Sequence, residues 1–116
     1  MADSDCLFCR ILNGDVPSTE VLSTTGTYAF RDVNPAAPVH VLVVPRIHIP
    51  HAGALRAEDA LVLAEMFSTA RDVAASEGVL ESGYRLVLNV GDDALNSVPH
   101  LHLHVLGGRR MGWPPG

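Results

Sequence analysis

The chain has 116 residues, of which 47% are hydrophobic and 18% charged, and its formal net charge is −5 at pH 7 with histidine neutral. This composition excludes a disordered chain, and the negative charge disfavours a polyanionic partner such as DNA. We therefore expect a single domain over residues 1–116 that binds no nucleic acid.

Neither a membrane segment nor an export signal is evident in the sequence. The longest apolar runs, such as VHVLVVP, are far shorter than the roughly 20 residues that span a bilayer. The N-terminal sequence MADSDCLFCR is acidic, and it lacks the basic segment followed by an apolar one that marks a secretory signal. We expect a cytoplasmic protein with no membrane partner.

The N-terminal segment combines a short predicted helix with a pair of cysteines. Residues 5–13 place apolar side chains at helical spacing, and Gly14 ends the run. Cys6 and Cys9 are separated by two residues. In a cytoplasmic chain such a pair favours metal binding or redox activity over a structural disulfide.

The next segments alternate between strand patterns and turn residues. Residues 18–25 and 27–35 are predicted to form two short strands joined by a turn at Gly26. Residues 39–45 are almost continuously apolar, which is typical of a central strand. The one polar residue of that run, His40, is either a core histidine satisfied by a backbone carbonyl or a residue that faces a functional site.

A single long helix is predicted over residues 57–77, with Gly78 just past its end. Its inner face is expected to comprise Leu63, Met66, Phe67, Ala70, Val73 and Ala74. Residues 84–90 follow as a strand that places Arg85 and Asn89 on one face. Consecutive strands favour antiparallel pairing, so the order of elements predicts an α+β fold.

Three of the six histidines alternate with apolar residues in the sequence HLHLHVL, at positions 100, 102 and 104. In a strand these rings lie on one face, about 6.6–7 Å apart. A row of three imidazoles suits a face that meets a polar ligand, whereas the simpler alternative is a half-exposed strand. The rings could chelate a metal, or one could attack an electrophile while the others support it, and the strand alone leaves both open.

The chain resembles the histidine-triad superfamily of nucleotide hydrolases and transferases, in its branch of histidine-triad nucleotide-binding proteins. The resemblance rests on HLHLHVL, on FRDVNPAAPVHVLVVPRIHI, on NSVPHLHLHVLGGR and on the ending WPPG, and it covers nearly the whole chain. It implies a five-stranded antiparallel sheet with one long helix and one short N-terminal helix. It also implies a homodimer in which the two sheets join.

The same resemblance implies hydrolysis of a purine nucleoside 5′-phosphoramidate. His102 would attack the α-phosphorus and form a nucleotidyl-histidine, which water then hydrolyses. His104 would hydrogen-bond a phosphate oxygen, while His100 and His40 would orient and polarise the nucleophile from behind. Ser97 would donate to the phosphate or to the departing amine.

Further positions correspond by the resemblance to nucleotide-binding residues. Asp32 would accept both ribose hydroxyls and Asn89 would line the phosphate site, although Asp32 also suits a turn before Asn-Pro. Trp113, in the tail, would shape the leaving-group pocket of the other subunit. An apolar slot for the base would be formed by Leu7, Phe8, Ile11 and Val33, for which core packing is the alternative.

In a related transferase branch, two such cysteines bind zinc together with two histidines. By position the ligands here would be Cys6, Cys9, His48 and His100, a donor set that suits tetrahedral zinc. Such a site is closed and therefore structural, so the chemistry itself would need no cofactor. The alternative is a pair of buried free thiols.

The chain departs from the family pattern in the loop before the triad. Leu95 stands where glycine is frequent and Asn96 where glutamine is frequent, while Pro99 directly precedes the triad. The other functions to weigh are a dinucleoside polyphosphate hydrolase, a non-catalytic nucleotide-binding or scaffold protein, and a metalloprotein that uses the triad as ligands. The intact triad and Ser97 favour the phosphoramidate hydrolase.

Overall fold

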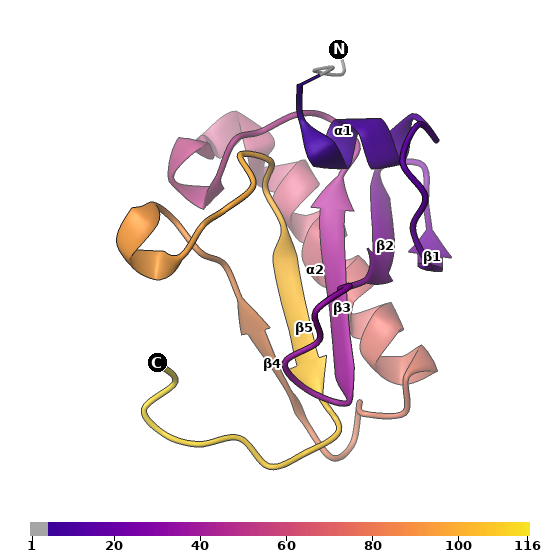
Figure 1. Ribbon diagram of the computed structural model, residues 1–116, viewed down its shortest axis with the longest axis vertical. Coiled ribbons are helices and arrows are strands. Elements are labelled where there is room, and N and C mark those ends of the chain that lie inside the picture. Colours follow the sequence, from indigo (N-terminus) through magenta and orange to yellow (C-terminus); the bar gives the residue numbers. More distant parts are fainter. Residues whose placement is uncertain (1–4) are drawn as a thin grey trace.

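The computed structural model describes residues 5–116 and shows an α+β fold, as predicted (Figure 1). The helices and strands are α1 (Leu7–Leu12), β1 (Glu20–Ser23), β2 (Thr27–Arg31), β3 (Val39–Pro45), α2 (Ala60–Ser76), β4 (Tyr84–Val87) and β5 (Leu103–Gly107). The 3-10 turns are η1 (Ala52–Ala54), η2 (Ala57–Asp59) and η3 (Asp92–Ala94).

The five strands form one antiparallel sheet in the order β1-β2-β3-β5-β4. The apolar strand β3 is central, as its sequence predicts, and β4 forms one outer edge (Figure 1). Leu42 of β3 is the register partner of His104 in β5. The sheet therefore brings the triad beside the strand that carries His40.

The two faces of the sheet bury different side chains, because successive residues of a strand point to opposite sides. Val41 and Val43 pack with α2, Leu103 and Val105 in one core. Leu42 and Val44 instead pack on the other face, in a core with the first residues of α1. Figure 1 shows α2 behind the sheet and α1 in front of it. His40, His102 and His104 lie on the α1 side of the sheet.

The long helix is shorter and turned differently from the prediction. Residues 57–59 form η2, and α2 begins at Ala60. Phe67 is 41% exposed and does not belong to the inner face. Thr69 is buried instead, and its hydroxyl lies 2.7 Å from that of Thr27 in β2. This hydrogen bond satisfies both hydroxyls inside the core that Met66, Ala70 and Val73 form with the sheet.

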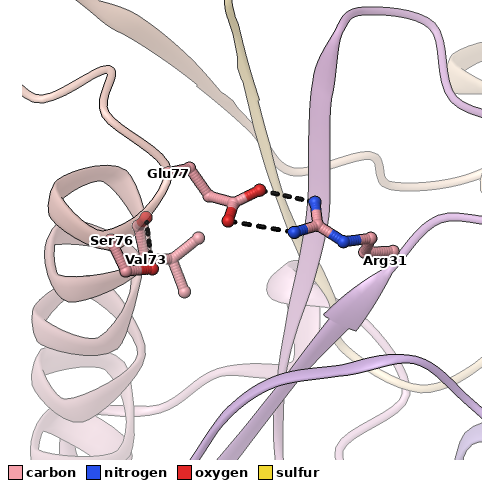
Figure 2. Close-up of polar contacts among 4 residues, drawn as sticks. All are labelled: Arg31, Val73, Ser76 and Glu77. Atoms are coloured by element: carbon pink, nitrogen blue, oxygen red, sulfur yellow. Dashed lines mark hydrogen bonds and ion pairs between the residues drawn. The ribbon is translucent and has the colours of Figure 1, made fainter.

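The C-terminus of α2 is tied to β2 by an ion pair on the surface. Figure 2 shows the Arg31 guanidinium paired through two nitrogens with the Glu77 carboxylate, and one of these contacts measures 3.0 Å. Gly78 follows with φ +76°, in the position expected for it. No helix of residues 5–116 has the length and apolarity required to span a bilayer.

The remaining strands differ from the predictions at their ends. β5 begins at Leu103, so His100 and His102 precede the regular strand, in an irregular segment whose backbone bends at residues 98–100. This segment is held by other contacts, since Leu101 donates its backbone N–H to the carbonyl of Ile49 at 2.6 Å. β4 ends at Val87, which leaves Asn89 beyond the strand.

Candidate active site and cysteine–histidine cluster

A cavity of about 430 Å³ opens beside the triad, between α1, the loop after β2 and the segment before β5. Eight of the residues that the sequence suggests line it: Leu7, Phe8, Ile11, Asp32, Val33, Ser97, His102 and His104. Its size falls in the range of small-molecule sites. The predicted base slot and the predicted phosphate-binding residues therefore share one cavity.

One end of this cavity is an aromatic slot. The Phe8 ring meets the Phe30 ring edge-on at 5.5 Å and the His102 ring edge-on at 5.1 Å. Leu42, the register partner of Phe30, lines the same wall. Phe30 and Leu42 are absent from the sequence prediction, although Leu42 pairs with Phe30 on one neighbouring strand and with His104 on the other, and this register could have revealed them.

Hydrogen bonding fixes the proton position on His102. Its Nδ1 lies 2.7 Å from the backbone carbonyl of His100. A carbonyl can only accept, so Nδ1 carries the hydrogen and, in the neutral ring, Nε2 keeps its lone pair. The buried His102 ring therefore offers a nucleophilic nitrogen in a cavity-lining position.

A second chain of hydrogen bonds runs through His40 to His104. The Ala36 N–H donates to His40 Nδ1 at 2.9 Å, which leaves the hydrogen of the neutral ring on Nε2. That Nε2 lies 2.9 Å from His104 Nδ1, so His104 accepts there and carries its own hydrogen on Nε2. The His104 Nε2 is buried and has no hydrogen-bond partner. The relay thus ends in an unpaired donor on a cavity-lining ring.

The protonation states of these rings support this relay. Burial, together with the nearby His102 and His40 rings, lowers the pKa of His104 to about 4. The Asp32 carboxylate acts in the opposite direction and raises it. Burial also lowers the pKa of His40, opposed by the Asp32 carboxylate. Both rings are therefore neutral at pH 7, as the hydrogen-bond directions require.

The contacts that His40 and His100 make around His102 involve groups that differ from those predicted. The ring of His40 contacts His104 rather than His102. The ring of His100 points toward the thiols of Cys6 and Cys9, and its backbone carbonyl is what holds His102. The backbone bends at His100, and the ring and the carbonyl of this residue point to different partners.

Asp32 combines the two roles weighed for it. Its Oδ1 accepts the N–H of Asn34 at 2.8 Å, which is the turn interaction, and its Oδ2 lies 3.3 Å from His40 Nε2. The residue also lines the cavity. The turn therefore places the carboxylate at the cavity instead of competing with that placement.

Two predicted residues are not among those that line the cavity of their own chain. Asn89 lies past the end of β4, an outer strand, and is not among the lining residues. Trp113 is 84% exposed. The Arg85 guanidinium donates to the carbonyl of Gly112 at 2.9 Å and holds the tail on the β4 side (Figure 1).

The four predicted metal ligands converge in a second cluster. His100 Nδ1 lies 3.4 Å from the Cys6 sulfur and 3.5 Å from the Cys9 sulfur, and His48 Nδ1 lies 3.3 Å from the latter. One ligand atom from each residue lies within 4.8 Å of the others. The Nε2 of His100 is 2.9 Å from the Pro45 carbonyl, so its Nδ1 lone pair faces the sulfurs. This donor set fits tetrahedral zinc.

Comparisons with known proteins agree with this geometry. A family model described as HIT domain matches residues 13–111. A "14 kDa zinc-binding protein" of Zea mays is 43% identical over 98% of this chain and 90% of its own length. "Adenylylsulfatase HINT1" of Arabidopsis thaliana is 40% identical over 99% of this chain and 79% of its own length. A solved HIT family hydrolase from Legionella pneumophila has a TM-score of 0.94 at 45% identity, covering 97% of this chain and 100% of that one.

Proposed function

The chain belongs to the HIT domain family, and from this premise we propose that it hydrolyses purine nucleoside 5′-phosphoramidates at the phosphorus–nitrogen bond. The observation that carries the proposal is His102, whose Nδ1–H is held by the His100 carbonyl so that Nε2 is free for attack. A neutral imidazole is nucleophilic near pH 7, and it is a good leaving group once phosphorylated and protonated.

The first step forms a bond between His102 Nε2 and the α-phosphorus and breaks the bond from phosphorus to the amine nitrogen. The amine departs with a proton, for which the Ser97 hydroxyl at the cavity wall is a donor. The Nε2–H of His104 is the donor that meets charge developing on a non-bridging phosphate oxygen. Water then attacks the phosphorus, returns a proton to the Ser97 oxygen, and breaks the bond to His102 Nε2, which releases the nucleoside monophosphate and restores the neutral His102.

The nucleoside would occupy the rest of the cavity. A purine fits the apolar walls of Leu7, Phe8, Ile11 and Phe30, where recognition depends on stacking and shape. Asp32 at the same cavity is an acceptor for the ribose hydroxyls, since a carboxylate can receive several hydrogen bonds.

We also propose that Cys6, Cys9, His48 and His100 hold a structural zinc ion. Bound zinc would cross-link α1 to the segment before β5, because these elements supply the ligands. Four protein ligands leave no open position, so the phosphoryl chemistry does not pass through this site. Its role would be to hold the helix that carries Leu7 and Phe8 against the sheet.

The protein would act as a homodimer, with residues 1–116 as one cytoplasmic domain. β4 is an outer strand of the sheet, and pairing two copies along it would join the sheets. Sedimentation should then give twice the chain mass of 12.4 kDa.

The name of the Arabidopsis relative supplies a second substrate to compare. Attack on the same α-phosphorus of adenylyl sulfate would release sulfate in place of an amine. A dinucleoside polyphosphate hydrolase would use the same nucleophile with a nucleotide leaving group. A non-catalytic nucleotide-binding protein would bind nucleotide and turn over none of the three.

The test is hydrolysis of a fluorogenic adenosine phosphoramidate, alongside adenylyl sulfate and a dinucleoside polyphosphate. We expect the phosphoramidate to have the highest kcat/KM, and His102→Ala to lower it by several orders of magnitude. Equal turnover by the wild type and His102→Ala would contradict the assignment of the nucleophile. A higher kcat/KM for either other substrate would replace the proposed substrate class.

A further inference from the structure

The loop after β2 carries part of the active site on irregular backbone. Residues 32–38 join β2 to β3 and contain neither helix nor strand. Asp32 opens this loop, and its carboxylate accepts the N–H of Asn34. Further along, Ala36 donates the N–H that meets His40 Nδ1 at 2.9 Å. The direction of that N–H therefore depends on what holds the middle of the loop.

A side chain from the segment after β5 contacts the middle of the loop. The Arg109 guanidinium donates from Nη2 to the carbonyl of Ala36 at 3.1 Å. From Nη1 it donates to the carbonyl of Arg110 at 3.2 Å, which ties the guanidinium to its own segment. Arg109 and Ala36 lie 73 residues apart in the sequence, so the bond joins two distant segments beside the relay.

The residue before Arg109 lies close against the same loop. Gly108 has φ +86°, in the region that favours glycine. A Cβ at this position would lie only 2.9 Å from the Cβ of Pro38. Glycine thus lets the backbone after β5 approach the loop, and this approach brings Arg109 within reach of the Ala36 carbonyl.

The contact matters because it bears on which ring nitrogens carry hydrogen. When one nitrogen of a neutral imidazole accepts a hydrogen bond, the hydrogen is on the other nitrogen. While the Ala36 N–H points at His40 Nδ1, His40 donates from Nε2 to His104, and His104 keeps its own hydrogen on Nε2. If the loop shifts, His40 is free to carry its hydrogen on Nδ1. Its Nε2 lone pair then favours a hydrogen on His104 Nδ1, and the donor that meets the phosphate is lost.

We propose that Arg109 is a positioning residue that sets the tautomers of His40 and His104 through the backbone of Ala36. It is not among the residues that line the active-site cavity, so it acts through the relay and not by touching the substrate. The effect on rate rests on the proposed hydrolysis. The effect on the rings requires no substrate.

The experiment compares Arg109→Met with Arg110→Met. Methionine keeps a long side chain but has no N–H to donate, and each variant removes one positive charge. Arg110 is the matched control, because it is adjacent and equally charged while the bond to Ala36 comes from Arg109.

Nitrogen-15 spectra of the histidine rings show which nitrogen carries the hydrogen. In the wild type and in Arg110→Met we expect it on Nε2 of His40 and His104. In Arg109→Met these two rings should shift toward a mixture of tautomers, while His102 keeps its hydrogen on Nδ1, because the His100 carbonyl holds it there.

Turnover of an adenosine phosphoramidate gives the second readout. Arg109→Met should lower kcat about threefold to tenfold, the effect of one net hydrogen bond, with KM within about twofold. Arg109→Lys keeps a donor on a long stem and should restore part of kcat. In a His40→Gln background Arg109→Met should have no further effect, because the ring through which it acts is gone.

Unchanged ring spectra in Arg109→Met would overturn the inference. An equal change in Arg110→Met would also overturn it, since the cause would then be the charge, and so would a full further loss of kcat in the His40→Gln background. A wild type without turnover would overturn the proposed function, whereas the ring spectra would still decide the role of Arg109.

Discussion

Within residues 5–116, two clusters bring potential metal ligands within 4.8 Å of one another, and they differ in where their lone pairs point. In the cluster of Asp32, His40 and His104, hydrogen bonds within the chain already use both nitrogens of His40 and Nδ1 of His104. In the cysteine–histidine cluster, His100 donates its Nε2–H to the Pro45 carbonyl, and its Nδ1 lone pair faces the sulfurs of Cys6 and Cys9.

The contrast shows that proximity alone does not define a metal site. In the first cluster, His40 accepts from the Ala36 N–H and donates to His104. This leaves the Nε2–H of His104 as an unpaired donor on a ring that lines the cavity. In the cysteine–histidine cluster, the thiols and imidazole nitrogens would form a closed metal site once the thiols lose their protons. His100 belongs to this cluster, whereas His104, four residues later, belongs to the cluster with Asp32 and His40.

Removing one thiol should have the largest effect on stability. Cys9→Ser should lose the zinc and lower the free energy of unfolding, by about 4 kcal/mol where free zinc exceeds the Kd a thousandfold. Elemental analysis and thermal unfolding with and without a chelator measure this. His40→Gln, in the other cluster, is the control and should keep one zinc per chain. Zinc retained in Cys9→Ser but lost in His40→Gln would reverse the assignment of the clusters.

Removing the His104 ring, whose Nε2–H ends the relay, should have the next largest effect, and this effect is on kcat. His104→Ala should lower kcat by about 10² to 10³, because the phosphate oxygen loses a preorganised donor. Thermal stability and zinc content should stay near those of the wild type. A kcat within twofold of the wild type would show that the relay serves only the fold.

The depressed pKa of His104 predicts a loss of stability in acid. Its pKa is about 4 in the folded chain and 6.5 ordinarily, so between these values the unfolded chain binds the extra proton. The free energy of unfolding should therefore fall as pH drops from about 6.5 toward 4, by up to about 1.4 kcal/mol per pH unit for this group. Urea titrations of wild type and His104→Gln measure this, and an equal slope in both would count against the buried neutral ring.

The smallest expected effect is at Leu95, whose backbone is left-handed with φ +62°. Leu95→Gly should leave the free energy of unfolding unchanged or raise it by up to about 1 kcal/mol, since relief of strain is partly offset by the entropy of glycine. Gly78→Leu, at the glycine with φ +76° after α2, should instead lower it. Urea denaturation of the two variants checks the pair, and a clear destabilisation in Leu95→Gly would mean that its side chain packs within the fold.

Much of this arrangement could be predicted from the sequence because it depends on local patterns. The almost continuous apolar run of residues 39–45 predicts the central strand, and Gly14 and Gly78 predict the ends of two helices. The eight cavity residues and the set of four possible metal ligands follow from the resemblance to the family, while spacing alone singles out the pair Cys6 and Cys9.

The rest depends on contacts between distant segments. Phe67 fits the helical stripe but is exposed, whereas Thr69 is buried and pairs with Thr27 of β2, a residue distant in sequence. The pairing of His40 with His104 depends on the register between β3 and β5. The backbone carbonyl of His100 contacts His102, where the prediction placed the His100 ring, because the backbone before β5 is irregular. The left-handed backbone of Leu95 contradicts its residue type, so no propensity predicts it.

The most direct test of the account is to trap the intermediate and map it. Wild-type protein quenched during turnover of an adenosine phosphoramidate should carry one adenylyl group on His102, seen by mass spectrometry, with its zinc content unchanged. His102→Ala should carry none. Turnover without any adduct on His102, or loss of zinc from His102→Ala, would show that this ring is not the free nucleophile that its hydrogen bond to His100 indicates.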